Sequence, residues 1–253
     1  MNAIIYAAGR GLRLGAQWEN IPKILLRFGN RSLLDRHVQN LAANQISHLT
    51  VVSGFAHELI TKELAQLRDQ YPLALHQLIN PDFTEGSTLS FHASIPILRQ
   101  QTNPVLLMDG DVLYPAQMLE RLIHSPHPSA LLVDRDFSTE DDDPVLVPIK
   151  NGRPFEFRKK WAGQSDLVGE SIGFFKLAPT DLPLLIEETS KRTEGPKRQD
   201  SYDEVIRVLV QAGRFGYEDV TGLPWTEIDF PADIERAQRE ILPAIDSRAA
   251  KVR

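Results

Sequence analysis

The first residues that could carry out chemistry form a short glycine-rich segment near the start of the chain. It reads Ala7-Ala8-Gly9-Arg10-Gly11-Leu12-Arg13-Leu14, and Pro22-Lys23 follows it. Two glycines separated by one residue let the backbone approach a phosphate closely and donate N–H groups to it. Arg13 can bind phosphate oxygens through its planar guanidinium, and Lys23 offers a second positive charge. The pattern predicts a phosphate site; a tight turn beside two surface bases is the alternative.

Two common phosphate-binding loops do not fit this segment. A Walker loop needs a Gly-Lys-Ser or Gly-Lys-Thr sequence, which the chain lacks. A dinucleotide-binding turn needs a third glycine and an acidic residue at the end of the second strand. Here that strand ends in Val52-Ser53-Gly54, without a carboxylate.

Carboxylates form a second group of chemically capable residues. Asp109-Gly110-Asp111 follows an apolar segment of strand length, and Asp229 ends the sequence Trp225-Thr226-Glu227-Ile228-Asp229. Two carboxylates at a sheet edge suit a hard cation that prefers oxygen ligands and also binds phosphate. Asp111 could instead cap a helix or a turn, and Asp229 could be the N-cap before Pro231.

Alternating strands and helices must position these residues. Buried strands separated by helices imply parallel pairing, and ligands then bind beyond the carboxyl ends of the strands. The glycine-rich segment and Asp109-Gly110-Asp111 follow the first and fourth expected strands, so both should lie at that edge. Strands are expected at 3–7, 49–53, 73–78, 105–108 and 129–133, and helices at 32–44, 57–70, 87–98 and 115–124.

The second half of the chain has a different pattern. Residues 145–149 and 154–159 flank Asn151-Gly152, which favours a β-hairpin because Asn-Gly readily adopts positive φ angles. A strand is expected at 173–177, with helices at 179–193, at 201–212 and from Pro231. A chain of 253 residues without a low-complexity linker is expected to fold as one α/β domain, 1–253.

Composition narrows the class of protein. The chain has 42% hydrophobic residues, 25% charged residues, no cysteine and a formal net charge of −6. Thiolate metal sites and a catalytic cysteine are therefore excluded, and no basic run favours nucleic acid as a partner. The sequence lacks a signal-peptide pattern and any stretch of about 20 apolar residues. We expect a cytoplasmic protein without membrane insertion, with a solvated loop at 140–143.

The glycine-rich segment and Pro22-Lys23 resemble the signature of nucleotidyltransferases that act on sugar phosphates and phosphorylated alcohols, which have the MobA-like NTP transferase fold. The resemblance continues through Gly110-Asp111 and Glu227-Ile228-Asp229 and is greatest to the phosphocholine cytidylyltransferase-like branch. It implies a Rossmann-like α/β fold, with a mostly parallel sheet flanked by helices. It also implies a nucleotide-binding half, 1–135, and an acceptor-binding half, 136–253, that contains the hairpin.

The resemblance also implies roles for individual residues. Arg13, Lys23 and Asp111 are expected to be catalytic, and Asp111 and Asp229 are expected to bind Mg²⁺. The branch often has Asn near the place of Gly86-Ser87, so the preference for CTP is open. Ser87 could simply be a helix N-cap. The expected nucleotide-binding residues are Ala8, Gly9, Gly11, Arg13, Lys23, Asn80, Ser87, Ser90 and Asp109.

Acceptor-binding residues are expected from the second half. Strand alternation would place Phe157, Lys159 and Trp161 on one face. Lys159 could then bind the acceptor phosphate, while Trp161 packs against a cationic or apolar headgroup. Glu170 matches the place of an acceptor-binding acid in sugar-using relatives. An exposed basic strand and an exposed strand charge are the respective alternatives.

The expected reaction needs little from the side chains beyond alignment and charge. A phosphate or phosphonate acceptor is already anionic, so its oxygen can attack the α-phosphorus and expel pyrophosphate without a general base. We expect CTP and a phosphorylated small alcohol, amine or phosphonate as substrates. One alternative is a sugar-1-phosphate nucleotidyltransferase that uses UTP, GTP or dTTP. Another is a GT-A glycosyltransferase that uses Asp109-Gly110-Asp111, which would give no role to Arg13 or Lys23. A third is an inactive nucleotide-binding regulator. The acceptor, the base and the oligomeric state stay open.

Overall fold

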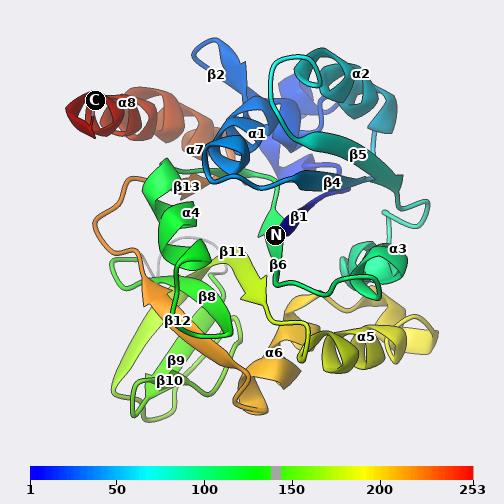
Figure 1. Cartoon of the computed structure of the whole chain (residues 1–253), viewed down its shortest axis with the longest axis vertical. Coiled ribbons are helices and arrows are strands. Elements are labelled where there is room, and N and C mark those ends of the chain that lie inside the picture. The colour runs from blue at the N-terminus through cyan, green and yellow to red at the C-terminus, as the bar shows by residue number, and fades with distance from the viewer. Residues whose placement is uncertain (138–143, 253) are drawn as a thin grey trace.

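A mixed nine-stranded sheet forms the centre of the protein within residues 1–137 and 144–252, which the computed structural model describes (Figure 1). The solvated loop expected at 140–143 lies outside these residues. The strand order is β10-β9-β11-β6-β1-β4-β5, and β8 and β12 continue the sheet beside β11. The strands of this sheet are β1 (Asn2–Ala7), β4 (His48–Ser53), β5 (Ala74–Ile79), β6 (Val105–Asp109), β8 (Ser129–Asp134), β9 (Leu146–Lys150), β10 (Arg153–Pro154), β11 (Leu167–Leu177) and β12 (Phe215–Asp219). The expected Rossmann-like α/β class is confirmed.

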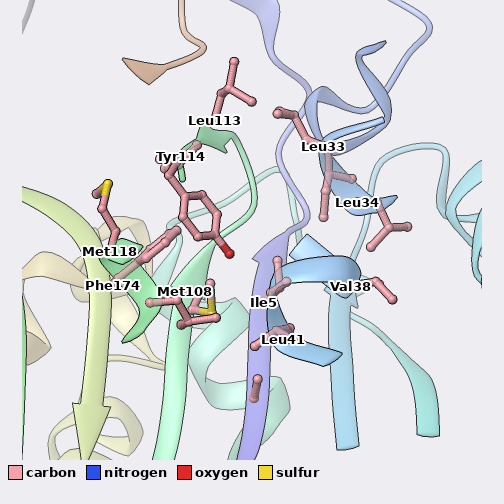
Figure 2. Packing of buried hydrophobic residues seen from close by; sticks show 14 of the residues in the cluster. Ile5, Leu33, Leu34, Val38, Leu41, Met108, Leu113, Tyr114, Met118 and Phe174 are labelled. Carbon is pink, nitrogen blue, oxygen red and sulfur yellow. The ribbon is translucent and has the colours of Figure 1, made fainter. Parts of the chain in front are cut away.

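Helices cover both faces of the sheet and bury two separate apolar clusters. Because successive side chains of a strand point to opposite faces, Ile5 packs with α1, α2 and α4, whereas Ile4 packs with α3, α5 and α6. Figure 2 shows the first cluster, in which Met108 and Phe174 lie near Tyr114. The helices are α1 (Leu33–Ala43), α2 (His57–Leu67), α3 (Thr88–Leu98), α4 (Ala116–Ile123), α5 (Leu182–Ser190), α6 (Asp203–Gln211), α7 (Pro231–Arg236) and α8 (Leu242–Val252). No helix in the described ranges has the length and apolar character needed to cross a bilayer.

The helix expected at 32–44 illustrates how local sequence defines an element. The Ser32 side chain accepts a hydrogen bond from the backbone N–H of Asp35 at 3.0 Å, as an N-cap residue does. The apolar residues Leu34, Val38 and Leu41 are fully buried on one face of the helix. Burying each such side chain contributes about 2 kcal/mol, so this face holds α1 against the sheet.

The parallel strands β6, β1, β4 and β5 bring the candidate residues to one edge. In the register, Tyr6 lies opposite Asp109 and Ala7 lies opposite Ser53. The chain therefore leaves β1 and β6 side by side, and the glycine-rich segment lies next to Asp109-Gly110-Asp111. The strands expected at 3–7, 49–53, 73–78 and 105–108 are confirmed to within one residue at each end.

Strand β11 is longer than expected and connects the two parts of the sheet. The expected strand at 173–177 begins at Leu167 instead, and its early residues pair with β9 whereas its late residues pair with β6. Its pairing with β8 shifts register between Ser171 and Phe175, at a β-bulge that contains Gly173 with a φ of 74°. The strand bends there. β12, which lies next to β8, is an element that the sequence analysis did not predict.

The hairpin at 145–159 forms, but its second strand is shorter than expected. Pro154 pairs with Ile149, whereas Arg158 pairs with Leu146. The segment from Pro154 to Arg158 therefore has one residue more than the segment from Leu146 to Ile149 that it faces. β10 ends at Pro154, and residues 155–161 form no strand apart from the isolated bridge at Arg158, so the strand alternation expected for Phe157, Lys159 and Trp161 does not occur.

Candidate active site

A cleft opens at the carboxyl ends of β1 and β6. The glycine-rich segment, the loop after β5, residues of β11 and the start of α6 line this cleft. Several of the expected site residues line this cleft, namely Ala8, Gly9, Gly11, Arg13, Lys23, Ser87, Ser90, Asp109, Asp111, Lys159, Glu170 and Asp229.

The glycine-rich segment bends tightly where phosphate binding was expected. Gly11 has a φ of 62°, and a Cβ at this position would lie 3.0 Å from Cγ of Lys23. The following turn, Leu12–Leu14, buries Leu14 in the core and leaves Arg13 exposed toward the cleft. Glycine at position 11 therefore permits both the left-handed backbone and the close approach of Lys23.

Arg13 and Lys23 converge on the carboxylate of Asp229. Nη2 of Arg13 lies 2.6 Å from Oδ2 of Asp229, and its guanidinium stacks 5.0 Å from the centre of the Phe230 ring. Nζ of Lys23 donates to Asp111 at 2.9 Å and also to Asp229. Burial alone would lower the pKa of Lys23, but the charges of Asp111 and Asp229 outweigh burial and raise it. Lys23 is therefore charged at neutral pH.

Three carboxylates meet beside Lys23. Oxygen atoms of Asp111, Glu227 and Asp229 lie within 4.8 Å of one another. The short strand β13 (Thr226–Glu227) pairs with β7 (Val112–Leu113), and Ile228, which is fully buried, donates its N–H to the Asp111 carbonyl at 3.0 Å. Glu227 and Asp229 flank this anchored residue, which directs both carboxylates toward Asp111.

Glu227 was not predicted as a site residue, although it stands two positions before Asp229. Glu227 and Asp229 stand on either side of the apolar residue Ile228, and this strand-like alternation was the sequence signal that could have identified Glu227. Partial desolvation within the cleft and the nearby charges of Asp111, Asp229 and Asp109 raise the pKa of Glu227 well above its usual range, although the residue is exposed to solvent. A divalent cation would relieve this repulsion, and the all-oxygen donor set fits the preference of Mg²⁺.

Asp109 and Asp111 make different contacts despite being two residues apart. The Tyr202 hydroxyl donates to Oδ2 of Asp109, and a Cβ on Gly173 would overlap that carboxylate. Burial and the charge of Asp111 raise the pKa of Asp109 well above its usual range, while the hydrogen bond from Tyr202 opposes this shift. Asp109 thus lies against β11 and α6, whereas Asp111 lies against Lys23.

The side chain of His37 contacts the backbone of the Asp109-Gly110-Asp111 turn. Its Nε2 lies 3.3 Å from the Gly110 carbonyl oxygen, and its Nδ1 lies 3.2 Å from the Tyr114 hydroxyl. Burial lowers the pKa of His37 to about 4, so the ring is neutral at pH 7. A neutral ring can donate from Nε2 to Gly110 while Nδ1 accepts from Tyr114. No sequence pattern distinguishes His37 from the other six histidines.

The expected base-reading residues occupy different positions. Asn80 is buried and donates to Oγ of Ser90 at 3.1 Å, so its side chain supports the loop from behind. Ser87 and Ser90 line the cleft. The Ser87 side chain makes no capping bond to α3 but accepts a hydrogen bond from the backbone N–H of Tyr202 at 3.0 Å.

Of the three residues expected to bind the acceptor, two line the cleft and one lies elsewhere. Lys159 and Glu170 line the cleft, together with Asp203 at the start of α6. The Trp161 ring instead packs edge-on against Phe155, with ring centres 5.4 Å apart. Trp161 does not line the cleft, so we do not assign it to the acceptor site.

The sequence belongs to a known family. A model of the MobA-like NTP transferase domain matches residues 3–166, which is more than half of the chain. The chain is therefore a member of this family and a nucleotidyltransferase.

Individual relatives and a solved structure agree with this assignment. The chain is 28% identical over 260 residues to the CMP-5'-(3-aminopropyl)phosphonate synthase of Streptomyces rubellomurinus, matching 96% of this chain but spanning only 39% of that protein. It is 24% identical to the CTP:phosphoglutamine cytidylyltransferase of Campylobacter jejuni, covering 93% of this chain and 98% of that protein. The inositol-1-phosphate CTP transferase of T. maritima shares the fold, with a TM-score of 0.76, 22% identity and coverage of 97% and 96% of the two chains.

Proposed function

We propose that this nucleotidyltransferase is a Mg²⁺-dependent cytidylyltransferase that couples CTP to a small phosphorylated or phosphonylated amine and releases pyrophosphate. The observation that carries the proposal is the convergence of Arg13 and Lys23 on Asp229, beside Asp111. Two cations and a carboxylate cluster at the end of a glycine-rich turn suit a triphosphate with its divalent cation. One relative is named for a CMP-linked product and another for the use of CTP, and both names favour cytidine as the nucleoside.

The side chains on the nucleotide side have separable tasks. Gly9 and Gly11 let the backbone approach the triphosphate, and Arg13 is exposed beside them to bind phosphate oxygens. Lys23 binds two carboxylates in this structure, and in this proposal its ammonium would stabilise the negative charge that develops during transfer. Ser87 and Ser90 face the cleft as candidates to read the base. In this proposal the carboxylates of Glu227 and Asp229, from the second half of the chain, complete the nucleotide site of the first half.

Asp111, Glu227 and Asp229 would hold the magnesium ion. A bound Mg²⁺ would neutralise phosphate charge and orient the triphosphate. Lys23 would then exchange its carboxylate partners for phosphate oxygens without leaving the cleft. The acceptor oxygen is already anionic, so the residues need only align it with the α-phosphorus and exclude water.

The acceptor end of the cleft combines one cation with two acids. Lys159 is the candidate to bind the acceptor phosphate or phosphonate. Glu170 and Asp203 line the same end of the cleft and provide negative charge for an ammonium group. In this proposal, a cleft end lined by both a cation and acids suits an acceptor that carries both an anionic phosphate or phosphonate and an ammonium group.

The glycosyltransferase alternative receives no support from the site. An Asp-x-Asp metal motif needs its carboxylates to converge on one ion, whereas Asp109 binds Tyr202 and Asp111 binds Lys23. A sugar-1-phosphate nucleotidyltransferase keeps the same chemistry and differs only in the base and the acceptor. It is therefore the alternative that an experiment must separate.

A pyrophosphate-release screen tests the proposal. Purified protein with Mg²⁺ is mixed with CTP, UTP, GTP, ATP or dTTP and with phosphocholine, 2-aminoethylphosphonate, 3-aminopropylphosphonate, inositol phosphate or glucose-1-phosphate. We expect the highest release with CTP and an amine-bearing acceptor, and none after chelation of the metal. Release only with a sugar phosphate would overturn the acceptor assignment. No release in any combination would count against the activity itself.

A further inference from the structure

Two loops that lie side by side at the cleft are joined by backbone hydrogen bonds. The first, residues 80–88, is here called the nucleotide-side loop, because Phe83 packs against Gly54 beside the glycine-rich segment. The second, residues 195–203, is called the clamp segment. Gly86 donates its N–H to the Arg198 carbonyl at 3.1 Å, and the Thr88 hydroxyl donates to the Asp200 carbonyl at 3.0 Å.

Arg198 connects the same two loops through its side chain. Its guanidinium lies 2.8 Å from Oδ2 of Asp82 and 2.5 Å from Oε2 of Glu85. A third bond runs from Nη1 to the carbonyl of Thr193 at 3.0 Å. One arginine thus binds two acids of the nucleotide-side loop and the backbone just before the clamp segment. A planar guanidinium with several donors is suited to such a multiple contact.

Gly86 lets the loops approach this closely. Any side chain here would overlap the carbonyl oxygen of Asp200, and its Cβ would lie 2.5 Å from the carbonyl carbon of Gln199. These atoms belong to the backbone, so they cannot move aside as a flexible side chain would. The contact between the two loops therefore depends on the absence of a side chain at position 86.

The clamp segment continues directly into the floor of the cleft. The Tyr202 ring stacks on Phe91 with ring centres 4.7 Å apart, and its hydroxyl donates to Asp109. Burial and the charge of Asp109 raise the pKa of Tyr202, so the phenol stays protonated and can donate. Asp203, the next residue, lines the acceptor end. A displacement of the clamp segment would therefore reach the floor and the acceptor wall together.

We propose that Arg198 and Gly86 are positioning residues that couple the two substrate subsites. The nucleotide-side loop and the clamp segment move as one unit, so a nucleotide whose base contacts residues 83–87 also fixes Tyr202 and Asp203 for the acceptor. The inference rests on the proposed function, because it requires the nucleotide to contact the first loop. It predicts that the acceptor binds more tightly after the nucleotide, and equally the reverse.

Hydrogen–deuterium exchange can test the coupling without knowledge of the acceptor. The probes are the α,β-methylene analogues of CTP, UTP, GTP and dTTP, each with Mg²⁺. In the wild-type protein, the analogue that binds should slow exchange at least about fivefold in both the nucleotide-side loop and the clamp segment. In Arg198→Ala, the same analogue at saturation should slow exchange in the loop alone. Arg198→Lys, which keeps the charge, should restore part of the effect in the clamp segment.

Matched variants separate coupling from general damage. Arg135→Ala removes an exposed ion pair with Asp219 at 2.7 Å and should keep protection in both segments. Gly86→Ala should behave as Arg198→Ala does, and Glu85→Gln provides a milder break if either variant does not fold. In steady-state kinetics, Arg198→Ala should raise the acceptor KM at saturating nucleotide by about fivefold or more.

The possible results have distinct meanings. Wild-type protection that stops at the nucleotide-side loop, or full protection of the clamp segment in both Arg198→Ala and Gly86→Ala, would overturn the coupling and leave the proposed function intact. Failure of all four analogues to bind the wild-type protein, together with no pyrophosphate release, would refute the proposed function and the coupling with it.

Discussion

The carboxylate of Asp109 occupies the space in which a side chain of residue 173 would begin. Gly173 has a φ of 74°, and a Cβ on it would overlap Oδ2 of Asp109. The bend of β11 and the place of Asp109 therefore depend on each other. Together they keep Asp109 facing Tyr202 and leave Asp111 to face Lys23.

Gly173→Ala is expected to destabilise the fold and to reduce turnover. The left-handed backbone alone costs a non-glycine residue about 1 kcal/mol, and the overlap with Asp109 adds to this. Gly152→Ala is the matched control, because Gly152 has a φ of 72° but no neighbouring atom within 4 Å. Urea denaturation should show the greater loss of unfolding free energy for Gly173→Ala. Equal losses would show that the overlap is easily relieved.

Lys23→Ala and Asp111→Asn should each lower turnover far more than they lower folding stability. Removing one preorganised group that stabilises developing charge typically reduces kcat by about 10²–10³. Pyrophosphate release under saturating substrates and thermal unfolding with Mg²⁺ present give the two readouts. Turnover like that of the wild type in either purified variant would remove that residue from the mechanism.

Glu227→Gln should weaken Mg²⁺ binding, whereas Asp109→Asn should leave it nearly unchanged. The first variant removes a carboxylate from the cluster with Asp111 and Asp229, and the second alters a carboxylate bound to Tyr202. Titration calorimetry with Mg²⁺ should show a loss of about tenfold or more, equal to about 1.4 kcal/mol, for Glu227→Gln. Equal losses in the two variants would contradict this division of the acidic residues.

His37 should make folding stability sensitive to mild acid. Its pKa is lowered to about 4 in the folded protein from 6.5, so the unfolded chain binds more protons between these values. This contribution is therefore complete above about pH 6.5 and is lost as the pH falls toward 4. The loss corresponds to about 3 kcal/mol.

A comparison with His37→Gln isolates this effect from the titration of carboxylates, which both proteins share. The difference in unfolding free energy between wild type and variant should shrink by about 3 kcal/mol from pH 7 to pH 4. A difference that does not vary with pH would show that His37 is solvated rather than buried beneath Gly110.

The parts of the fold that follow from local patterns were predictable from the sequence. The apolar segments that became β1, β4 and β6 are nearly continuous because both faces of these strands are buried, whereas β5 lies at the sheet edge and is partly exposed. The edge where ligands bind then followed from parallel pairing, and the structure places Arg13, Lys23, Asp111 and Asp229 together there.

The remaining features depend on contacts that are distant in the sequence. Glu227 joins the carboxylate cluster only because β13 pairs with β7, more than a hundred residues away. Tyr202 takes part in the site through its hydrogen bond to Asp109, and His37 through its contact with Gly110. Neither contact produces a pattern in the neighbouring sequence from which it could be predicted. Trp161 was misplaced because the expected strand ends at Pro154, so strand alternation does not extend to residue 161.

The pairing of β11 with strands from the first half of the chain limits which gene segments relatives of this enzyme could exchange by recombination. A crossover between residues 135 and 136 would separate β8 and β6 from β11, and β8 from β12, although each pair shares ladder hydrogen bonds. A recombinant gene joined at this point would have to match three foreign interfaces at once. New acceptor preferences in this lineage should therefore arise by substitution within the loops that line the cleft, rather than by shuffling of half-genes.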